Sequence, residues 1–120
     1  LYFYPKDFTS VCTAEACGFR ENFAFFEGLD VPVLGVSRDD LATHHRFREA
    51  HELPFHLLAD TKGAVSKQYG ANIPFVNMTR RITYLLDADH RVAGVLENMF
   101  SARRHIDEMI AQLKRTSSAG

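Results

Sequence analysis

The sequence has little cysteine and no surplus of charge, and it lacks any long apolar run. Its 120 residues carry 14 basic and 15 acidic side chains, for a formal net charge of −1. This near-neutral charge gives no indication that the protein binds nucleic acid or an anionic membrane. No run approaches the roughly 18 apolar residues of a membrane-spanning helix, and no signal-peptide pattern is visible. These absences predict a protein that binds neither nucleic acid nor membrane.

Only two cysteines are present, Cys12 and Cys17. Without a visible export signal, so few cysteines favour a reducing compartment, so we expect a cytoplasmic protein with catalytic rather than structural thiols. Their C-x4-C spacing fits no common zinc pattern, and no second cysteine pair completes a site. We therefore expect neither a metal nor a cofactor.

What is present is organised around the stretch from Pro5 to Cys17, which follows a strand-like apolar run, Leu1 to Tyr4. Thr9 and Ser10 suit the N-cap of the helix that follows. A thiol at Cys12 would face free backbone N–H groups and the positive end of the helix dipole. Both favour the thiolate, which is the nucleophilic form.

The spacing of the two cysteines limits what they can do. Cys12 begins an apolar stripe with helical spacing, so it also fits the role of a small buried apolar residue. Cys17 lies five residues on, which in a helix separates the two Cα atoms by roughly 8–9 Å. A disulfide needs Cα atoms within about 7 Å. The pair can therefore bond only if the first turns of the helix unwind. This spacing does not suit a permanent structural disulfide.

The motif Pro5-x3-Thr9-x2-Cys12 resembles the active-site signature of the peroxiredoxins. A second cysteine five positions later is similar to the bacterioferritin comigratory protein/peroxiredoxin Q branch. Four more segments stand in the order of that branch, and the resemblance runs from Leu1 to about Leu113. These segments are Gly35–Asp39, Leu53–Asp60, Tyr69–Gly70 and Arg81–Asp87.

The resemblance implies an α/β thioredoxin-like sandwich, in which helices flank a central mixed sheet. Residues 1–115 would form a single domain, and residues 116–120 a flexible tail. Because the family carries further strands upstream, we expect N-terminal strands to be missing, with a sheet position that these residues do not fill. Periodicity and turn residues place the elements in a compatible order. We expect strands at 1–4, 31–36, 55–59, 82–86 and 92–96, and helices at 12–28, 41–52, 64–69 and 102–114.

The histidines of the helix expected at 41–52 and the histidine of the hairpin turn carry separate expectations. On the helix expected at 41–52, His44, His45 and His51 read as a solvated polar face, with a metal site as the alternative. His90 stands where the family usually has glycine in the hairpin turn. Histidine tolerates a left-handed backbone conformation better than most residues, so we expect the turn to be retained.

The resemblance also implies a reaction. Cys12 would attack hydrogen peroxide or an organic hydroperoxide and become a sulfenic acid. Thr9 and Arg81 would hold the peroxide, Pro5 would shield the sulfur, and Cys17 would resolve the sulfenic acid as a disulfide. A thioredoxin-type dithiol would then reduce the disulfide, in a monomer or weak dimer. Strand alternation places the neighbouring Arg80 on the opposite face.

Two other classes of function remain open. A general thiol–disulfide oxidoreductase is one, although that chemistry normally uses the closer C-x-x-C spacing. A non-catalytic thioredoxin-like binding module with vestigial thiols is the other. The reactivity of Cys12 towards peroxide separates both from a peroxidase.

Overall fold

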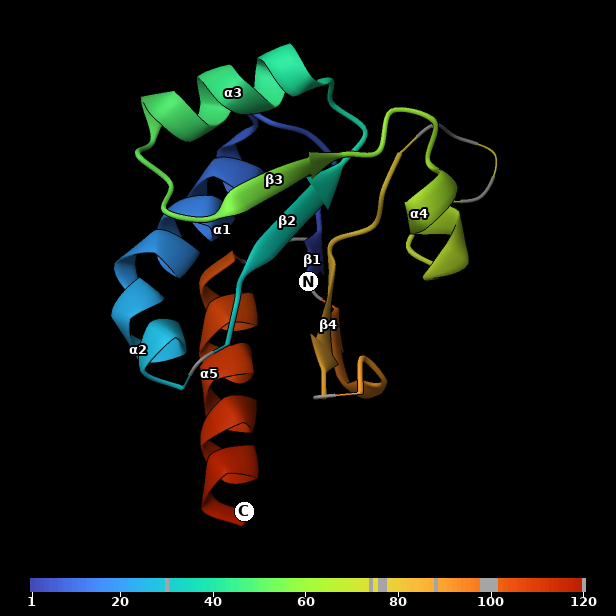
Figure 1. Cartoon of the computed structure of the whole chain (residues 1–120). Coiled ribbons are helices and arrows are strands. Elements are labelled where there is room, and N and C mark those ends of the chain that lie inside the picture. Colours follow the sequence, from blue (N-terminus) through green and yellow to red (C-terminus); the bar gives the residue numbers. More distant parts are fainter. Residues whose placement is uncertain (30, 74, 76–77, 88, 98–101, 120) are drawn as a thin grey trace.

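The computed structural model describes residues 1–29, 31–73, 75, 78–87, 89–97 and 102–119. Its centre is one five-stranded sheet in the order β3-β2-β1-β4-β5 (Figure 1). Parallel pairing joins β1 to β2 and β2 to β3, whereas β4 runs antiparallel to both β1 and β5. The sheet is therefore mixed, as expected. The strands are β1 (Tyr2–Phe3), β2 (Leu34–Ser37), β3 (His56–Ala59), β4 (Ile82–Leu86) and β5 (Val92–Glu97).

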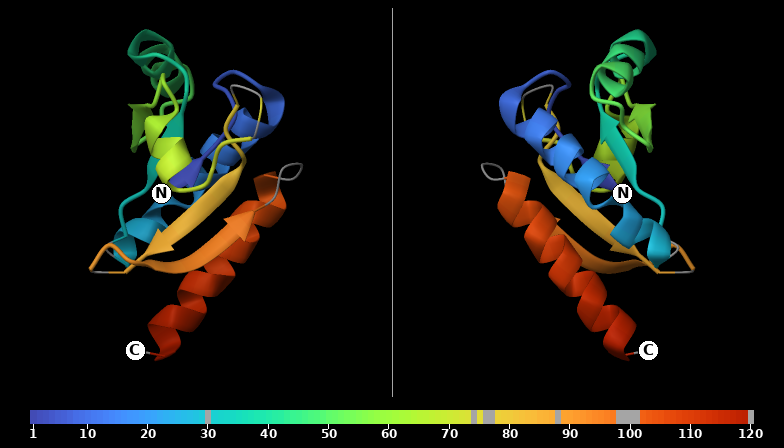
Figure 2. Two further views of the ribbon diagram at one scale, coloured as in Figure 1. Left: turned by 90° about the vertical axis from the view of Figure 1, so that its right-hand side faces the viewer. Right: turned by 90° about the vertical axis from the view of Figure 1, so that its left-hand side faces the viewer.

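Helices cover both faces of this sheet. α5 lies along the β4–β5 hairpin on one face, and α4 lies on the opposite side (Figure 2). No helix in the described part of the chain is both long and apolar enough to cross a membrane. The helices are α1 (Ser10–Glu21), α2 (Phe23–Gly28), α3 (Leu41–Ala50), α4 (Ala64–Gln68) and α5 (Ala102–Ala119).

The first residues of the chain divide the core in two, because successive side chains of a strand point to opposite faces. Tyr2 and Tyr4 pack in the larger cluster, which takes side chains from α1, α2, α3 and α5. Phe3 packs in the smaller cluster, beside Ala71 just after α4. The chain therefore leaves β1 on the face where α1 packs, and this sets the position of Cys12.

The helix predicted at 12–28 is two helices, which corrects the sequence-based expectation. α1 ends at Glu21 and α2 begins at Phe23. Asn22 interrupts them: its side-chain amide donates to the Gly18 carbonyl over 2.8 Å. Asparagine competes in this way for backbone groups that a continuing helix would use. Apolar spacing alone did not reveal the break, because Phe26 still packs in the same core as Cys12.

The C-terminal helix is longer than predicted. α5 continues to Ala119, whereas the sequence placed its end at Lys114. The flexibility expected for residues 116–120 stays a prediction. The predicted core face of this helix is confirmed, because Ile106, Met109 and Leu113 are buried.

Two further expectations concern the sheet and its hairpin. The sequence predicted a strand position that these residues do not fill. In the order β3-β2-β1-β4-β5 the three inner strands are paired on both sides, so an unfilled position would lie beyond β3 or β5, and it stays a prediction. His90 adopts a φ of 62°, which confirms the expected left-handed turn residue between β4 and β5.

Candidate active site

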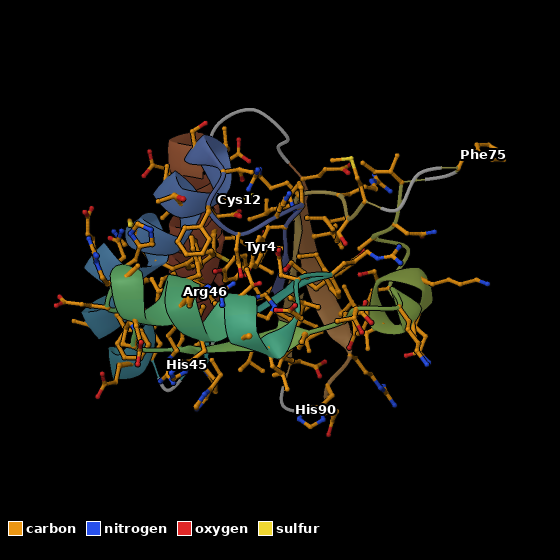
Figure 3. The ribbon with its side chains drawn as sticks, turned by 90° about the horizontal axis from the view of Figure 1, so that it is seen from above. Tyr4, Cys12, His45, Arg46, Phe75 and His90 are labelled. Atoms are coloured by element: carbon orange, nitrogen blue, oxygen red, sulfur yellow. The ribbon has the colours of Figure 1, made fainter. Side chains whose placement is uncertain are left out.

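Cys12 lies in the first turn of α1, directly after the loop that leaves β1. Its side chain is 1% exposed and packs in the larger core cluster with Ala16 and Phe19. Figure 3 shows Cys12 near Tyr4, at the start of α1. The predicted direction of this thiol, towards the core, is confirmed. A nucleophile here is sheltered from bulk water.

Arg81 supplies the positive charge at this thiol. It directly precedes β4, whose antiparallel pairing with β1 brings it back to the start of α1. One guanidinium nitrogen of Arg81 donates to the Cys12 Sγ over 3.2 Å, and another donates to a Glu15 carboxylate oxygen over 2.8 Å. The Arg81 side chain is 4% exposed. A buried cation in contact with sulfur favours the negatively charged thiolate.

Glu15 completes a buried charge group that the sequence analysis missed. Its side chain is fully buried beside Arg81. Burial raises the pKa of Glu15 to about 7, although the charge and hydrogen bond of Arg81 oppose this rise. The available signal was the spacing, because residues three apart on a helix share a face. Near neutral pH the carboxyl group can therefore change its protonation state within contact of the cation that serves Cys12.

Arg80 lies on the other face, as strand alternation predicted. Its Nε donates over 2.6 Å to the carboxylate of Glu97 on β5. Both side chains of this pair are more than a third exposed. Of the two adjacent arginines, only Arg81 is buried against the sulfur.

A buried hydrogen-bond network holds the loop between β1 and α1 in place. The Tyr4 hydroxyl donates to one carboxylate oxygen of Asp7 over 2.5 Å, and His44 Nδ1 lies 2.6 Å from the other. The backbone N–H of Asp7 donates to Asp39 over 2.9 Å. Asp7 therefore ties the loop before Cys12 to β1, to α3 and to the residues after β2.

His44 corrects the expectation of a solvated polar face. It is 3% exposed, while its neighbour His45 is exposed and pairs with Glu49. His44 Nε2 lies 3.1 Å from the Leu58 carbonyl oxygen, which can only accept, so this nitrogen carries a proton. Burial opposes a charged ring, but the hydrogen bond and charge of Asp7 outweigh it and raise the pKa of His44.

Asp7, Asp39 and His44 also bring three potential metal-ligand atoms within 4.8 Å of one another. Such a set could hold a cation. Hydrogen bonds already account for its geometry, because the two His44 nitrogens face the Asp7 carboxylate and the Leu58 carbonyl. The cluster is thus explained as a buried ion pair that positions the loop.

Phe8 and Thr9 shape the loop next to Cys12. Phe8 has a φ of 62°, a conformation uncommon for a non-glycine residue, and its ring lies edge-on to Phe47 at 5.1 Å. Thr9 is the N-cap residue of α1, but its hydroxyl donates to the Lys6 carbonyl over 2.8 Å and makes no cap hydrogen bond. Pro5 is partly buried where this loop begins.

Cys17 lies on α1 five residues beyond Cys12, and both cysteines are free thiols. One unbroken helix carries them, as predicted. The Cys17 sulfur lies 3.9 Å from His51 Nδ1, at the end of α3. The structure brings Cys12 and Arg81 into contact, and it places Pro5 and Thr9 in the adjoining loop. It keeps Cys17 apart, against a histidine that the sequence analysis had not linked to it.

The fold and site together define a thioredoxin-like protein with a sheltered thiol at a helix start, held against an arginine. The AhpC/TSA family model matches residues 1–95. Chloroplastic peroxiredoxin Q from Arabidopsis thaliana is 39% identical over 117 residues, covering 95% of this chain and 53% of that protein. Its counterpart from Oryza sativa subsp. japonica is 37% identical over 115 residues, with the same coverage.

Solved structures agree. Peroxidoxin BcpB from Mycobacterium tuberculosis matches with a TM-score of 0.87 and 31% identity, over 95% of this chain and 76% of that one. A mutant of Xanthomonas campestris peroxiredoxin Q gives a TM-score of 0.87 and 29% identity, over 96% and 76%. The chain belongs to the AhpC/TSA family, in its bacterioferritin comigratory protein/peroxiredoxin Q branch. It spans about half the length of the curated relatives that it matches.

Proposed function

We propose that this chain is a thiol peroxidase that reduces hydrogen peroxide and organic hydroperoxides through Cys12. The observation that carries the proposal is the 3.2 Å contact between the Arg81 guanidinium and the Cys12 sulfur. The thiolate sulfur attacks the terminal peroxide oxygen, the O–O bond breaks, and the departing oxygen takes up a proton. Negative charge grows on that oxygen, so a fixed cation accelerates the step.

The other loop residues have supporting roles in the proposal. The Thr9 hydroxyl donates to Lys6, so it retains lone pairs that can accept a hydrogen bond from the peroxide. Pro5 limits the access of water to the sulfur. Asp7 holds this loop through its buried partners, so the loop is preorganised before substrate arrives.

Organic hydroperoxides are included for two reasons. The exposed aromatic side chain next to the thiol loop is Phe8, which is 53% exposed, whereas Phe75 points away from the site (Figure 3). In addition, a solved structure of Xanthomonas campestris bacterioferritin comigratory protein, 28% identical to this chain, was described in connection with alkyl peroxide reduction activity. An exposed apolar ring on the loop that precedes Cys12 suits an alkyl substituent.

Cys17 is the proposed resolving thiol. It attacks the sulfur of the Cys12 sulfenic acid, an S–S bond forms, and water leaves. Because one helix carries both thiols, the first turns of α1 must unwind. Two features lower the cost of unwinding: α1 has no side-chain N-cap bond, and Gly18 weakens the helix by about 1 kcal/mol relative to alanine. A thioredoxin-type dithiol then reduces the bridge, in a reducing compartment such as the cytoplasm.

Intact mass after one equivalent of hydrogen peroxide tests this function. We expect the wild-type chain to lose two hydrogens, as an intramolecular disulfide. The Cys17→Ser variant should gain one oxygen, which a sulfenic-acid trap such as dimedone captures, and it should not be recycled by thioredoxin. The Cys12→Ser variant should not react.

Two results would contradict the proposal. Unchanged mass in the wild-type protein would favour a vestigial thiol and a binding module. Rapid insulin reduction without peroxide consumption would favour a general thiol–disulfide oxidoreductase.

A further inference from the structure

Resolution requires Cys17 to be a thiolate, and the start of α1 cannot provide this. The favourable field of a helix N-terminus falls off within the first turn. Cys12 lies in that turn, whereas Cys17 lies beyond the middle of the helix. An ordinary thiol titrates near pH 8.5, so only about 3% of it is ionised at pH 7. Some other group near Cys17 must take its proton if resolution is to be fast at neutral pH.

His51 is placed for this task. Its Nδ1 lies 3.9 Å from the Cys17 Sγ, within the range of a hydrogen bond to sulfur. Both side chains are partly buried, so the pair is partly shielded from water. A neutral imidazole accepts a thiol proton and then stabilises the thiolate as a neighbouring cation.

Contacts from both helices hold His51 in position. Its backbone N–H donates to the Phe47 carbonyl over 3.2 Å and closes the end of α3. Its ring lies edge-on to Phe47, with 5.0 Å between ring centroids. Arg20, one turn after Cys17 on α1, donates to the His51 carbonyl over 2.7 Å. This last bond joins the half of α1 that carries Cys17 directly to the residue that carries the base.

We propose that His51 is a catalytic residue of the resolving half-reaction, which takes the proton of Cys17 before Cys17 attacks the Cys12 sulfenic acid. This inference rests on the proposed function. His51 Nδ1 takes the thiol proton, and the Cys17 sulfur donates an electron pair to the Cys12 sulfur. The S–S bond forms and the S–O bond breaks. The leaving hydroxide takes up one proton and departs as water, and His51 gives up the proton that it took from Cys17, so the step consumes no further reagent.

Other charged groups lie around the Cys17–His51 pair. Arg20 binds the His51 backbone, and two carboxylates line, together with Cys17, a hollow of about 440 Å³ between α1 and α5. On the His51 side the next residue in the chain is acidic. These acidic residues are Glu21, Asp107 and Glu52.

Quenched-flow mass spectrometry at pH 7 and pH 9 tests the assignment, by following sulfenic acid and disulfide separately after one equivalent of peroxide. For His51→Gln we expect sulfenic acid to form at the wild-type rate. Disulfide formation should slow by about 10–30-fold at pH 7, the gain available from ionising an ordinary thiol. At pH 9, above the pKa of about 8.5 of an ordinary thiol, the difference should shrink to about twofold.

His45→Gln is the matched control. His45 lies on the side of α3 turned away from Cys12 and is exposed (Figure 3). We expect both of its rates to match those of the wild type. An equal slowing of His51→Gln at both pH values would indicate a structural role and overturn the assignment, as would a wild-type resolution rate at pH 7. Absence of the disulfide in the wild-type protein would instead contradict the proposed function.

A second measurement does not depend on the resolving reaction. In a Cys12→Ser background, the rate of iodoacetamide alkylation at Cys17 reports its thiolate directly. We expect His51→Gln to slow this alkylation by about 10-fold or more at pH 7 and by little at pH 9. Equal alkylation rates of Cys17 at pH 7 in the Cys12→Ser protein with and without the His51→Gln substitution would contradict the proposal.

Discussion

α1 and α3 both begin after a buried strand and a short polar loop, but a side chain caps only one of them. At α3, the Asp40 carboxylate accepts a hydrogen bond from the Thr43 N–H over 2.8 Å. At α1, Thr9 has the extended backbone of an N-cap residue, but its hydroxyl turns to Lys6 instead. The helix that carries the thiols therefore has the less stabilised start. Without a side-chain cap, the first turn of α1 should open at a lower cost than the first turn of α3.

The start of α1 is stabilised by the buried ion pair between Asp7, in the loop before this helix, and His44 on α3. Removing one partner of a buried ion pair leaves an uncompensated charge. We therefore expect His44→Leu, which strands the Asp7 carboxylate, to lower the free energy of unfolding by about 3–5 kcal/mol. Urea denaturation measures this loss. His45→Leu on the same helix should change stability by less than about 0.5 kcal/mol.

The contribution of the His44–Asp7 pair to the free energy of unfolding depends on pH, and the sign of this dependence follows from the raised pKa of His44. Because the folded-state pKa of His44 is raised, its stabilising contribution is complete below the ordinary histidine pKa of about 6.5. That contribution is lost as pH rises through the folded-state value. The difference between wild type and His44→Leu should therefore narrow at alkaline pH. A loss of less than about 1 kcal/mol at pH 6 would show that this pair does not anchor the loop.

Arg81 and Arg80 sharpen the comparison by separating charge at the thiol from charge at the surface. We expect Arg81→Met to lower the rate constant for peroxide consumption by about 10²–10³-fold, as for removal of a fixed donor at a developing anion. Arg80→Met removes an exposed ion pair and should leave that rate within about twofold. Stopped-flow measurement with a coupled peroxide assay distinguishes them. Equal losses in the two variants would remove the special role of Arg81.

Glu15 should make the fold less stable as pH rises towards neutrality. Because its folded-state pKa is raised to about 7, the native state keeps a proton that the unfolded chain releases above about pH 4.5. Stability should therefore fall between about pH 5 and 7, by up to about 1.4 kcal/mol per pH unit from this group. Glu15→Gln should remove that component. Denaturation curves across this range check it, and identical slopes in both proteins would contradict it.

Substitutions at the N-cap positions of α1 and α3 should have the smallest effect on the free energy of unfolding. Asp40→Ala removes a side-chain cap and should lower the free energy of unfolding by about 1 kcal/mol. Thr9→Ala removes no cap, so we expect a loss of less than about 0.5 kcal/mol but a clear loss of peroxidase activity. Thermal unfolding and peroxide consumption, measured on both variants, give the two readouts. A stability loss at Thr9 as large as that at Asp40 would erase the difference between the helices.

Local patterns predicted much of this molecule. Apolar runs and turn residues indicated the strands, and the motif register selected Arg81 over Arg80. Peroxiredoxin resemblance supplied the fold, and the family match confirms it. The contact between Arg81 and Cys12 depends on the pairing of β1 with β4. Strand alternation predicted the face on which Arg81 lies, but it could not predict this pairing.

What the sequence analysis missed depends on contacts between distant segments. His44 reads as part of a polar helix until Asp7, from another loop, is placed beside it. A signal was present, because His44, Phe47 and His51 share the helical spacing of a buried face. The break at Asn22 was missed for a different reason, since the apolar stripe continues across it into α2.

Hydrogen–deuterium exchange on peptides from α1, in reduced protein and after one equivalent of peroxide, tests the central claim most directly. We predict that oxidation joins the two sulfurs and sharply increases exchange over Thr13–Gly18, while protection of α3 is unchanged. Oxidised protein in which α1 stays protected and its thiols stay unbridged would contradict the account.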